Sequence, residues 1–350
     1  MNQMLISVVL QRCLILPLLF FCIFSCDKMS SASTGRSLEK ELPSNKQGGT
    51  EILTENTDSA LYMQKARQLM LTDTLIPDTP ATFLPVPVCD AILPFNRIVA
   101  MYGNFYSSHM GILGSLDEDE LLKLLDSESE SWNQADPLTP VMPAIHYIAV
   151  TAQKSPGKGK KYRLRMPAHQ MNKAIRLARK AEGITFLDIQ VGHSTVRDEL
   201  SLLREYLMMP DVHLALDPEW SMRDGSVPGS KIGSMHADDI NYASEWLAAL
   251  VKKHRLPPKI LVVHRFTEGM IEDYRKIQKN KHVQIVINMD GFGFPAKKKH
   301  TYKNVVGRKP IQFTGFKLFY QNDKKDPPYR LLSHEEILQL HPKPLYIQYQ

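Results

Sequence analysis

Residues 184–217 read "ITFLDIQVGHSTVRDELSLLREYLMMPDVHLALD" and contain a strand pattern, a helix pattern and a second strand pattern. Residues 184–192 and 212–217 are short apolar runs rich in β-branched side chains, which are typical of buried strands. Over residues 194–209, Leu, Val and Met recur at three- and four-residue spacing, which predicts an amphipathic helix with Ser194 as its N-cap. A strand, a helix and a second strand in this order form the βαβ unit of a parallel sheet.

The same alternation continues through residues 85–350. Eight runs have the strand pattern: residues 97–103, 141–150, 184–192, 212–217, 259–266, 283–291, 313–321 and 344–350. Amphipathic stretches separate most of them, at residues 117–127, 168–183, 194–209, 236–254, 268–280 and 333–340. Ser333 and Glu336 form a capping box at the start of the last of these stretches.

Eight strands in roughly 265 residues predict an α/β fold of the (β/α)8 TIM-barrel type, which typically takes about 250 residues. The connection from the sixth to the seventh strand, residues 296–310, is the least helical part of the pattern. A doubly wound open sheet is the alternative fold. No glycine-rich phosphate-binding pattern follows the first strand, so the alternative gains no support.

Residues 1–26 differ in composition from the rest of the chain. An apolar run follows Arg12 and is shorter than the ~20 residues that span a bilayer, which indicates an export signal. The run ends in "IFSC", which resembles the lipobox of bacterial lipoproteins and predicts lipidation of Cys26. Residues 27–84 are rich in Ser, Thr, Gly and Asn, which predicts a flexible, disordered tether with a short helix near residues 60–71.

The net charge and the cysteine content limit the partners and cofactors that we expect. The net charge is +6, but no basic stripe interleaved with aromatic residues is present, so nucleic acid is not an expected partner. Removal of the signal and lipidation of Cys26 leave Cys89 as the last of four cysteines, so neither a disulfide framework nor a cysteine metal site is expected. We expect a monomer without a cofactor, anchored by lipid to a membrane of the bacterial cell envelope, in the periplasm or at the outer surface.

Polar side chains follow the apolar part of most predicted strands. In (β/α)8 barrels the active site lies at the carboxyl ends of the strands. The candidate residues there are Tyr102 and Asn104, Asp188 and Gln190, Asp217 and Glu219, His264, Asp290, Lys317 and Tyr320, and Gln348 and Tyr349. Because strand side chains alternate faces, Asp188 shares a face with Gln190, and Asp217 shares one with Glu219. Asp290 also suits a tight turn, since Gly291 and Gly293 follow it.

The pair Asp217 and Glu219 is the main catalytic candidate. Helix capping explains at most one of two carboxylates placed one residue apart, and cleavage of a glycosidic bond needs two carboxyl groups. One, with a raised pKa, protonates the departing oxygen, and the other acts as nucleophile or base or stabilises positive charge. We assign Glu219 as the acid and Asp217 as the stabilising partner, with Trp220 and nearby tyrosines as faces for sugar stacking.

The sequence resembles two known families, and the first resemblance supports this interpretation. The Asp-x-Glu of Asp217 and Glu219 resembles chitinase-type hydrolases and a family of barrel muramidases, in which the Glu is the acid and the Asp assists. More of the chain, including "RIVAMYGNFYSSHMGILG", "FLDIQVGHS", "VHLALDPEW" and "LPPKILVVHRF", resembles an uncharacterised family of secreted bacterial proteins and lipoproteins related to glycoside-hydrolase barrels. The second resemblance implies the fold and the export of the chain, but no established activity.

Two other classes of function stay open. Asp188, Asp217, His264 and Asp290 carry suitable ligand groups for a divalent metal, which would make a metal-dependent hydrolase. No H-x-H or H-E-x-x-H spacing supports that alternative. The third class is a tethered module that binds a cell-wall or other glycan without cleaving it.

Overall fold

The computed structural model describes residues 58–70 and 84–350. Its centre is a barrel of eight parallel strands: β1 (Arg97–Gly103), β2 (Val141–Ala152), β4 (Ile184–Ile189), β5 (Val212–Leu216), β7 (Lys259–Arg265), β9 (Val283–Met289), β10 (Phe313–Leu318) and β11 (Tyr346–Tyr349). The barrel closes because β1 pairs with β2 on one side and with β11 on the other. The predicted (β/α)8 barrel is confirmed.

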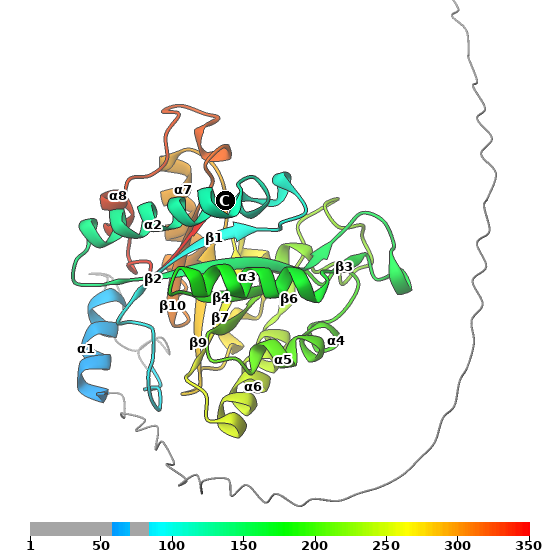
Figure 1. The fold of residues 1–350 in the computed structure, drawn as a ribbon, viewed down its shortest axis with the longest axis horizontal. Coiled ribbons are helices and arrows are strands. Elements are labelled where there is room, and N and C mark those ends of the chain that lie inside the picture. Colours follow the sequence, from blue (N-terminus) through cyan, green and yellow to red (C-terminus); the bar gives the residue numbers. More distant parts are fainter. Residues whose placement is uncertain (1–57, 71–83) are drawn as a thin grey trace, which may run out of the picture. The chain divides into compact units, whose positions relative to one another are not determined.

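Helices cover the outside of the barrel (Figure 1). They are α2 (Glu118–Ala135), α3 (Ala168–Lys180), α4 (Val196–Leu200), α5 (Arg204–Leu207), α6 (Ala237–His254), α7 (Pro295–Thr301) and α8 (His334–Leu338). The capping box predicted at Ser333 and Glu336 is present at the start of α8. Among the described residues, no helix combines the length and the apolar character needed to cross a membrane.

Three local predictions differ from the structure. The helix after β4 begins with Thr195 as N-cap, because the hydroxyl of Ser194 donates instead to Glu199 Oε1 at 2.5 Å. Residues 268–280 form no α-helix. They contain 3-10 turns and the short strand β8 (Ile271–Glu272), which pairs with β6 (Met235–His236), and the left-handed backbone of Asp273 breaks a helix there. Residues 296–310 are more helical than predicted, since α7 continues into a π-helix (Tyr302–Gly307).

A short antiparallel extension lies beside the barrel. Strand β3 (Arg163–Arg165) pairs with the end of β2, and a register shift interrupts the pairing of β2 with β4 between Ile148 and Val150. The hairpin between β2 and β3 is therefore an insertion at the carboxyl end of the barrel, where polar side chains gather.

Alternation of side chains along the strands gives the barrel two hydrophobic layers. The larger lies between the outward side chains of the strands and the helices, and the smaller fills the lower interior with residues such as Ala100, Phe186 and Val262. The helix α1 (Ser59–Met70), close to the helix expected at residues 60–71, contributes Tyr62 and Ala66 to this interior layer. This part of the stretch predicted to be a tether therefore packs against the barrel. The signal sequence, Cys26 and the rest of the tether lie outside the described residues, apart from Leu84.

Candidate functional site

The carboxyl ends of the strands surround a cavity of about 680 Å³. Seven of the residues predicted for the site line it: Tyr102, Gln190, Asp217, Glu219, Trp220, Asp290 and Lys317. This volume lies within the ~300–1,000 Å³ range of small-ligand sites. The strands of a barrel converge at this end, so side chains far apart in the sequence meet around one opening.

Five predicted residues do not reach the cavity: Asp188 and His264, which lie beneath it, and Asn104, Tyr320 and Gln348. Asn104 is buried in the loop after β1, where its side chain bonds the carbonyl of Ile148 and the amide of Tyr106. Tyr320 donates a hydrogen bond to Glu128 on α2, outside the barrel. Gln348 lies in the interior and bonds the Tyr346 hydroxyl at 3.0 Å. The prediction that Asn104, Tyr320 and Gln348 contact a substrate has no geometric support.

The aromatic ring of Tyr349 also lies outside the cavity. Its hydroxyl accepts a hydrogen bond from Trp132 Nε1 at 3.0 Å, and its ring stacks on Tyr320. Both tyrosines therefore pack strands β10 and β11 against α2, since the side chain of Tyr349 follows the outward face of β11.

Asp217 and Glu219 lie where β5 turns into a 3-10 helix (Pro218–Trp220). Asp217 caps this turn, because its Oδ1 accepts a hydrogen bond from the Glu219 amide at 3.2 Å. Its Oδ2 accepts a second bond from Gln190 Nε2 at 3.2 Å. The two carboxylates thus differ in position: Asp217 is 2% exposed and bonded within the wall, whereas Glu219 is half-buried at the cavity.

Burial raises the pKa of both groups. For Glu219, burial and then the negative charge of Asp290 raise the pKa to about 7, against an opposing effect of Lys317 and His264. For Asp217, burial raises the pKa well above its usual value, and the nearby Asp188 adds to the rise. A protonated carboxyl group is therefore available at the cavity near neutral pH.

Asp290 is the ionised carboxylate of the cavity. Its Oδ1 lies 3.0 Å from Lys317 Nζ and its Oδ2 lies 3.0 Å from His264 Nδ1. Burial opposes ionisation, but Lys317 and His264 outweigh it, so the pKa of Asp290 is lowered. Lys317 Nζ also lies 3.6 Å from the ring centroid of Tyr102. A role in a tight turn, which the following glycines suggested, therefore does not fully explain Asp290, because both of its carboxylate oxygens pair with cationic groups.

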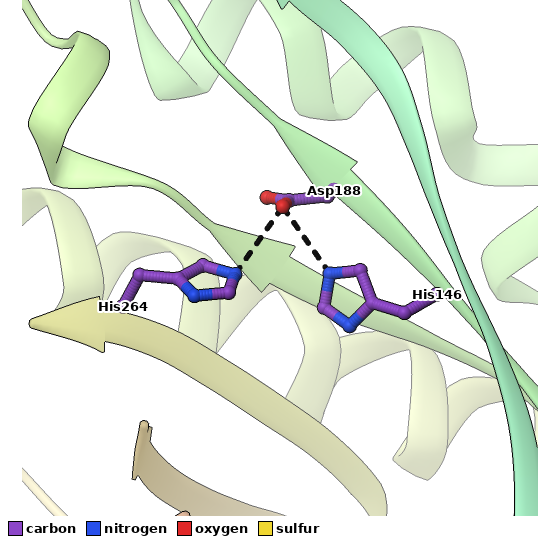
Figure 2. A group of neighbouring side chains, drawn as sticks. All are labelled: His146, Asp188 and His264. Atoms are coloured by element: carbon purple, nitrogen blue, oxygen red, sulfur yellow. Dashed lines mark ion pairs between the residues drawn. The ribbon is translucent and has the colours of Figure 1, made fainter. Parts of the chain in front are cut away.

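A second polar layer lies in the barrel interior beneath the cavity. Figure 2 shows the imidazoles of His146 and His264 facing the same oxygen of Asp188. Their Nε2 atoms lie 3.2 and 3.3 Å from that oxygen, respectively. All three side chains are 0% exposed, and none lines the cavity. Asp188 and His264, predicted to contact a substrate, are thus placed below its floor. Their ligand atoms and that of His146 lie within 4.8 Å of one another, so these residues could hold a metal ion.

Burial and the neighbouring charges shift the pKa of each of these three side chains. Burial lowers the pKa of His146 to about 4, despite the opposing effect of Asp188. Burial also acts against the charged form of His264, but Asp290 and Asp188 outweigh it and raise the pKa of His264 to about 10. The pKa of Asp188 is lowered, because the two imidazoles outweigh its burial.

Several residues of the site were not predicted from the sequence. His146 lies in "AIHYI", where an imidazole in the middle of an apolar strand is a signal that was available. Alternation with Ala144 and Ile148 would have placed it on the inward face of β2. Phe266 and Phe292 line the cavity but lie in loops, where no periodicity indicates direction.

The fold and the acidic cavity define the class of the protein as a (β/α)8 barrel with a polar site at the carboxyl ends of its strands. No protein-family model matches the chain, and no curated protein matches it. Membership in the uncharacterised family that the sequence resembles stays a prediction.

Solved structures with some similarity to the chain include three glycoside hydrolases. A ruminal GH26 endo-β-1,4-mannanase is 12% identical, with 73% of this chain and 59% of the mannanase covered and a TM-score of 0.33. The Bacillus subtilis mannanase man26 is 11% identical, with 73% and 79% covered and a TM-score of 0.38. A GH18 chitinase from Pseudoalteromonas aurantia is 11% identical, with 72% and 79% covered and a TM-score of 0.27.

Proposed function

We propose that the cavity hydrolyses a glycosidic bond, with Glu219 as the general acid. This proposal rests on one observation: two carboxyl groups line the same cavity, and their pKa values are shifted in opposite directions. Burial raises the pKa of Glu219 to about 7, whereas Lys317 and His264 lower that of Asp290. Two carboxyl groups whose pKa values are pushed apart are suited to divide acid and base roles.

Asp290 takes the role of the ionised carboxylate in this proposal. The sequence assigned that role to Asp217, but burial raises the pKa of Asp217 and favours its neutral form. Asp290 keeps its charge and its position through Lys317 and His264. It stabilises positive charge that develops at the sugar, or it accepts a proton from the attacking water.

Asp217 assists Glu219 from within the wall. It bonds the Glu219 backbone amide, so it holds the turn that directs the Glu219 side chain. This arrangement agrees with the expected role of the Asp in the Asp-x-Glu pattern, which is to assist the acid. Gln190 completes the support, because it bonds both Asp217 and the amide of Ala152 on β2.

Aromatic side chains favour a glycan as the ligand of the cavity. Trp220, Phe266 and Phe292 line it, and Phe292 is 54% exposed. A flat apolar ring beside a few oriented polar groups is a suitable surface for the C–H face of a sugar.

The metal-dependent hydrolase has less support than the carboxyl mechanism. Of its four expected ligands, Asp217 and Asp290 line the cavity, whereas Asp188 and His264 lie below it. The four therefore do not converge on one position that faces a substrate.

A cell-envelope location completes the proposal. Lipid on Cys26 would anchor the chain to a membrane, and the residues that follow would carry the barrel to a glycan at the envelope. This part is supported by the composition of residues 1–26 and by the lipobox-like "IFSC".

Product release from a panel of peptidoglycan and polysaccharides tests the proposed hydrolysis. The purified chain is incubated with each polymer, and new reducing ends are measured together with binding by co-sedimentation. We expect at least one polymer to release products. Binding without any product across the panel would replace the enzyme with a glycan-binding module, and neither binding nor product would remove the glycan proposal.

A further inference from the structure

The interior cluster of His146, Asp188 and His264 has the arrangement of a metal site. The three side chains come from the neighbouring strands β2 and β4 and from β7 across the interior, and each is fully buried. Both Nε2 atoms approach one Asp188 oxygen at 3.2 and 3.3 Å (Figure 2). Ligands at the ~2.0–2.2 Å of Zn–N and Zn–O bonds in a tetrahedral site lie about 3.3 Å apart, which matches these separations.

Four atoms of this cluster lack a well-directed hydrogen bond. They are the Nε2 atoms of both histidines and both carboxylate oxygens of Asp188, and all are shielded from solvent. A buried polar atom without a directed partner costs free energy, and a buried carboxylate costs more. The protein itself offers these four atoms only the ion pairs among them. A cation bound between the three side chains would give them a directed partner.

The far nitrogen of each imidazole is held by a further group. His146 Nδ1 lies 2.5 Å from the Tyr346 hydroxyl, and His264 Nδ1 lies 3.0 Å from Asp290 Oδ2. Histidines that bind metals commonly donate their other N–H to such a partner, which orients the ring toward the ion. Both rings are therefore oriented with Nε2 toward Asp188, as metal ligation requires.

We propose that His146, Asp188 and His264 bind one divalent transition-metal ion, with Zn²⁺ as the best match to the two-histidine, one-carboxylate set. On binding, the ion displaces the Nε2 proton of the His264 imidazolium, which is released to solvent. The neutral His146 offers the lone pair of Nε2 and keeps its one proton on Nδ1, toward Tyr346. Tyr102 lies on the cavity side, with its ring centroid 5.1 Å from that of His146 and 5.9 Å from that of His264. The ion therefore stabilises the floor of the cavity by joining three strands, and it does not contact the substrate.

Metal analysis and thermal unfolding of the unmutated full-length chain are the first test. After treatment with EDTA, Zn²⁺ is added and the unbound ion is removed. We expect one Zn²⁺ per chain and a rise in Tm of roughly 5–10 °C at Zn²⁺ well above its Kd. Substitution with Co²⁺ should produce the visible absorption of a tetrahedral site, which needs no mutation. Absence of both stoichiometric Zn²⁺ and the Tm rise would overturn the proposal.

Variants then locate the ion. His146→Gln and Asp188→Asn should each lose the stoichiometric Zn²⁺, and Tyr346→Phe should bind it roughly 10–100-fold more weakly. The matched control is His213→Gln, because His213 is also buried in the barrel but bonds the Ile260 amide. Retention of one Zn²⁺ by both ligand variants would contradict this location and indicate another site, such as the half-buried His236. The metal proposal can fail while the glycan proposal holds, since their readouts are separate.

Discussion

Lys317 Nζ lies 3.0 Å from Asp290 Oδ1, and this ion pair joins the ends of β10 and β9 at the floor of the cavity. The pair keeps a carboxylate ionised although it is 8% exposed. The charge of that carboxylate in turn raises the pKa of Glu219. One lysine therefore influences both members of the proposed catalytic pair.

Replacement of the proposed acid should abolish most of the activity. In Glu219→Gln the side chain keeps its size but cannot donate a proton, so we expect kcat/KM to fall by about 10²–10⁴-fold with glycan binding and Tm nearly unchanged. Reducing-end assays and thermal unfolding measure these effects. Glu245→Gln is the matched control, because Glu245 is exposed on α6. Full activity in Glu219→Gln would remove the acid assignment.

The dependence of kcat/KM on pH should reflect the two carboxyl groups. Glu219 must be protonated, so activity should be present below its pKa of about 7 and be lost as the pH rises through that value. Asp290 must be ionised, so activity should be lost only when the pH falls through its lowered pKa. A profile that rises through pH 7 would contradict these roles.

Removal of the Lys317 charge should shift the pH profile of kcat/KM to higher pH. Lys317 lowers the pKa of both Glu219 and Asp290, so Lys317→Met should raise both and shift both limbs to higher pH. The measurement is kcat/KM across pH for the variant and the unmutated chain. Unshifted limbs in a folded variant would show that Lys317 has no such effect.

The buried pair of Lys298 and Asp323 should contribute strongly to stability. Lys298 Nζ lies 2.6 Å from Asp323 Oδ2, and both are 1% exposed. Lys298→Met leaves a buried carboxylate without its cation, so we expect the free energy of unfolding in urea to fall by about 3–5 kcal/mol. The adjacent Lys299→Met is the control, because Lys299 is partly exposed and its loss should have a much smaller effect. Equal losses would contradict this difference.

Helix α1 should contribute to the stability of the barrel. Tyr62 is 0% exposed and belongs to the interior hydrophobic layer, so Tyr62→Ala should lower the free energy of unfolding by about 3–5 kcal/mol. Leu61→Ala, at a 42% exposed position of the same helix, is the matched control. Urea unfolding of both variants decides whether the folded domain includes α1, since a tether would make the two substitutions equivalent.

Loss of the proposed lipid anchor should change where the chain is found. Cys26→Ala removes the thiol that would carry lipid, so we expect the precursor to stay uncleaved by the lipoprotein signal peptidase or the chain to leave the membrane fraction. Membrane fractionation and the mass of the mature N-terminus measure this. Normal processing and unchanged fractionation would argue against lipidation.

Much of the fold was predictable because its signals are local. Apolar runs and three- to four-residue periodicity report which segments bury a face, and eight repeats of that pattern leave few architectures. The prediction was wrong at residues 268–280, where a left-handed Asp273 and the pairing of β8 with β6 override the helical spacing. Position at a strand end likewise predicted Asp217, Glu219 and Asp290 at one cavity, as the structure has them.

The sequence by itself determined the order of the eight barrel strands and of most of the helices between them, since both follow from local periodicity. Only the tertiary structure decided that the pKa of Asp290 is lowered while that of Asp217 is raised, because pKa values depend on burial and on charges from distant strands. Closure of the barrel also brought His146 beside Asp188 and His264. That meeting depends on the register between strands, which no local pattern encodes.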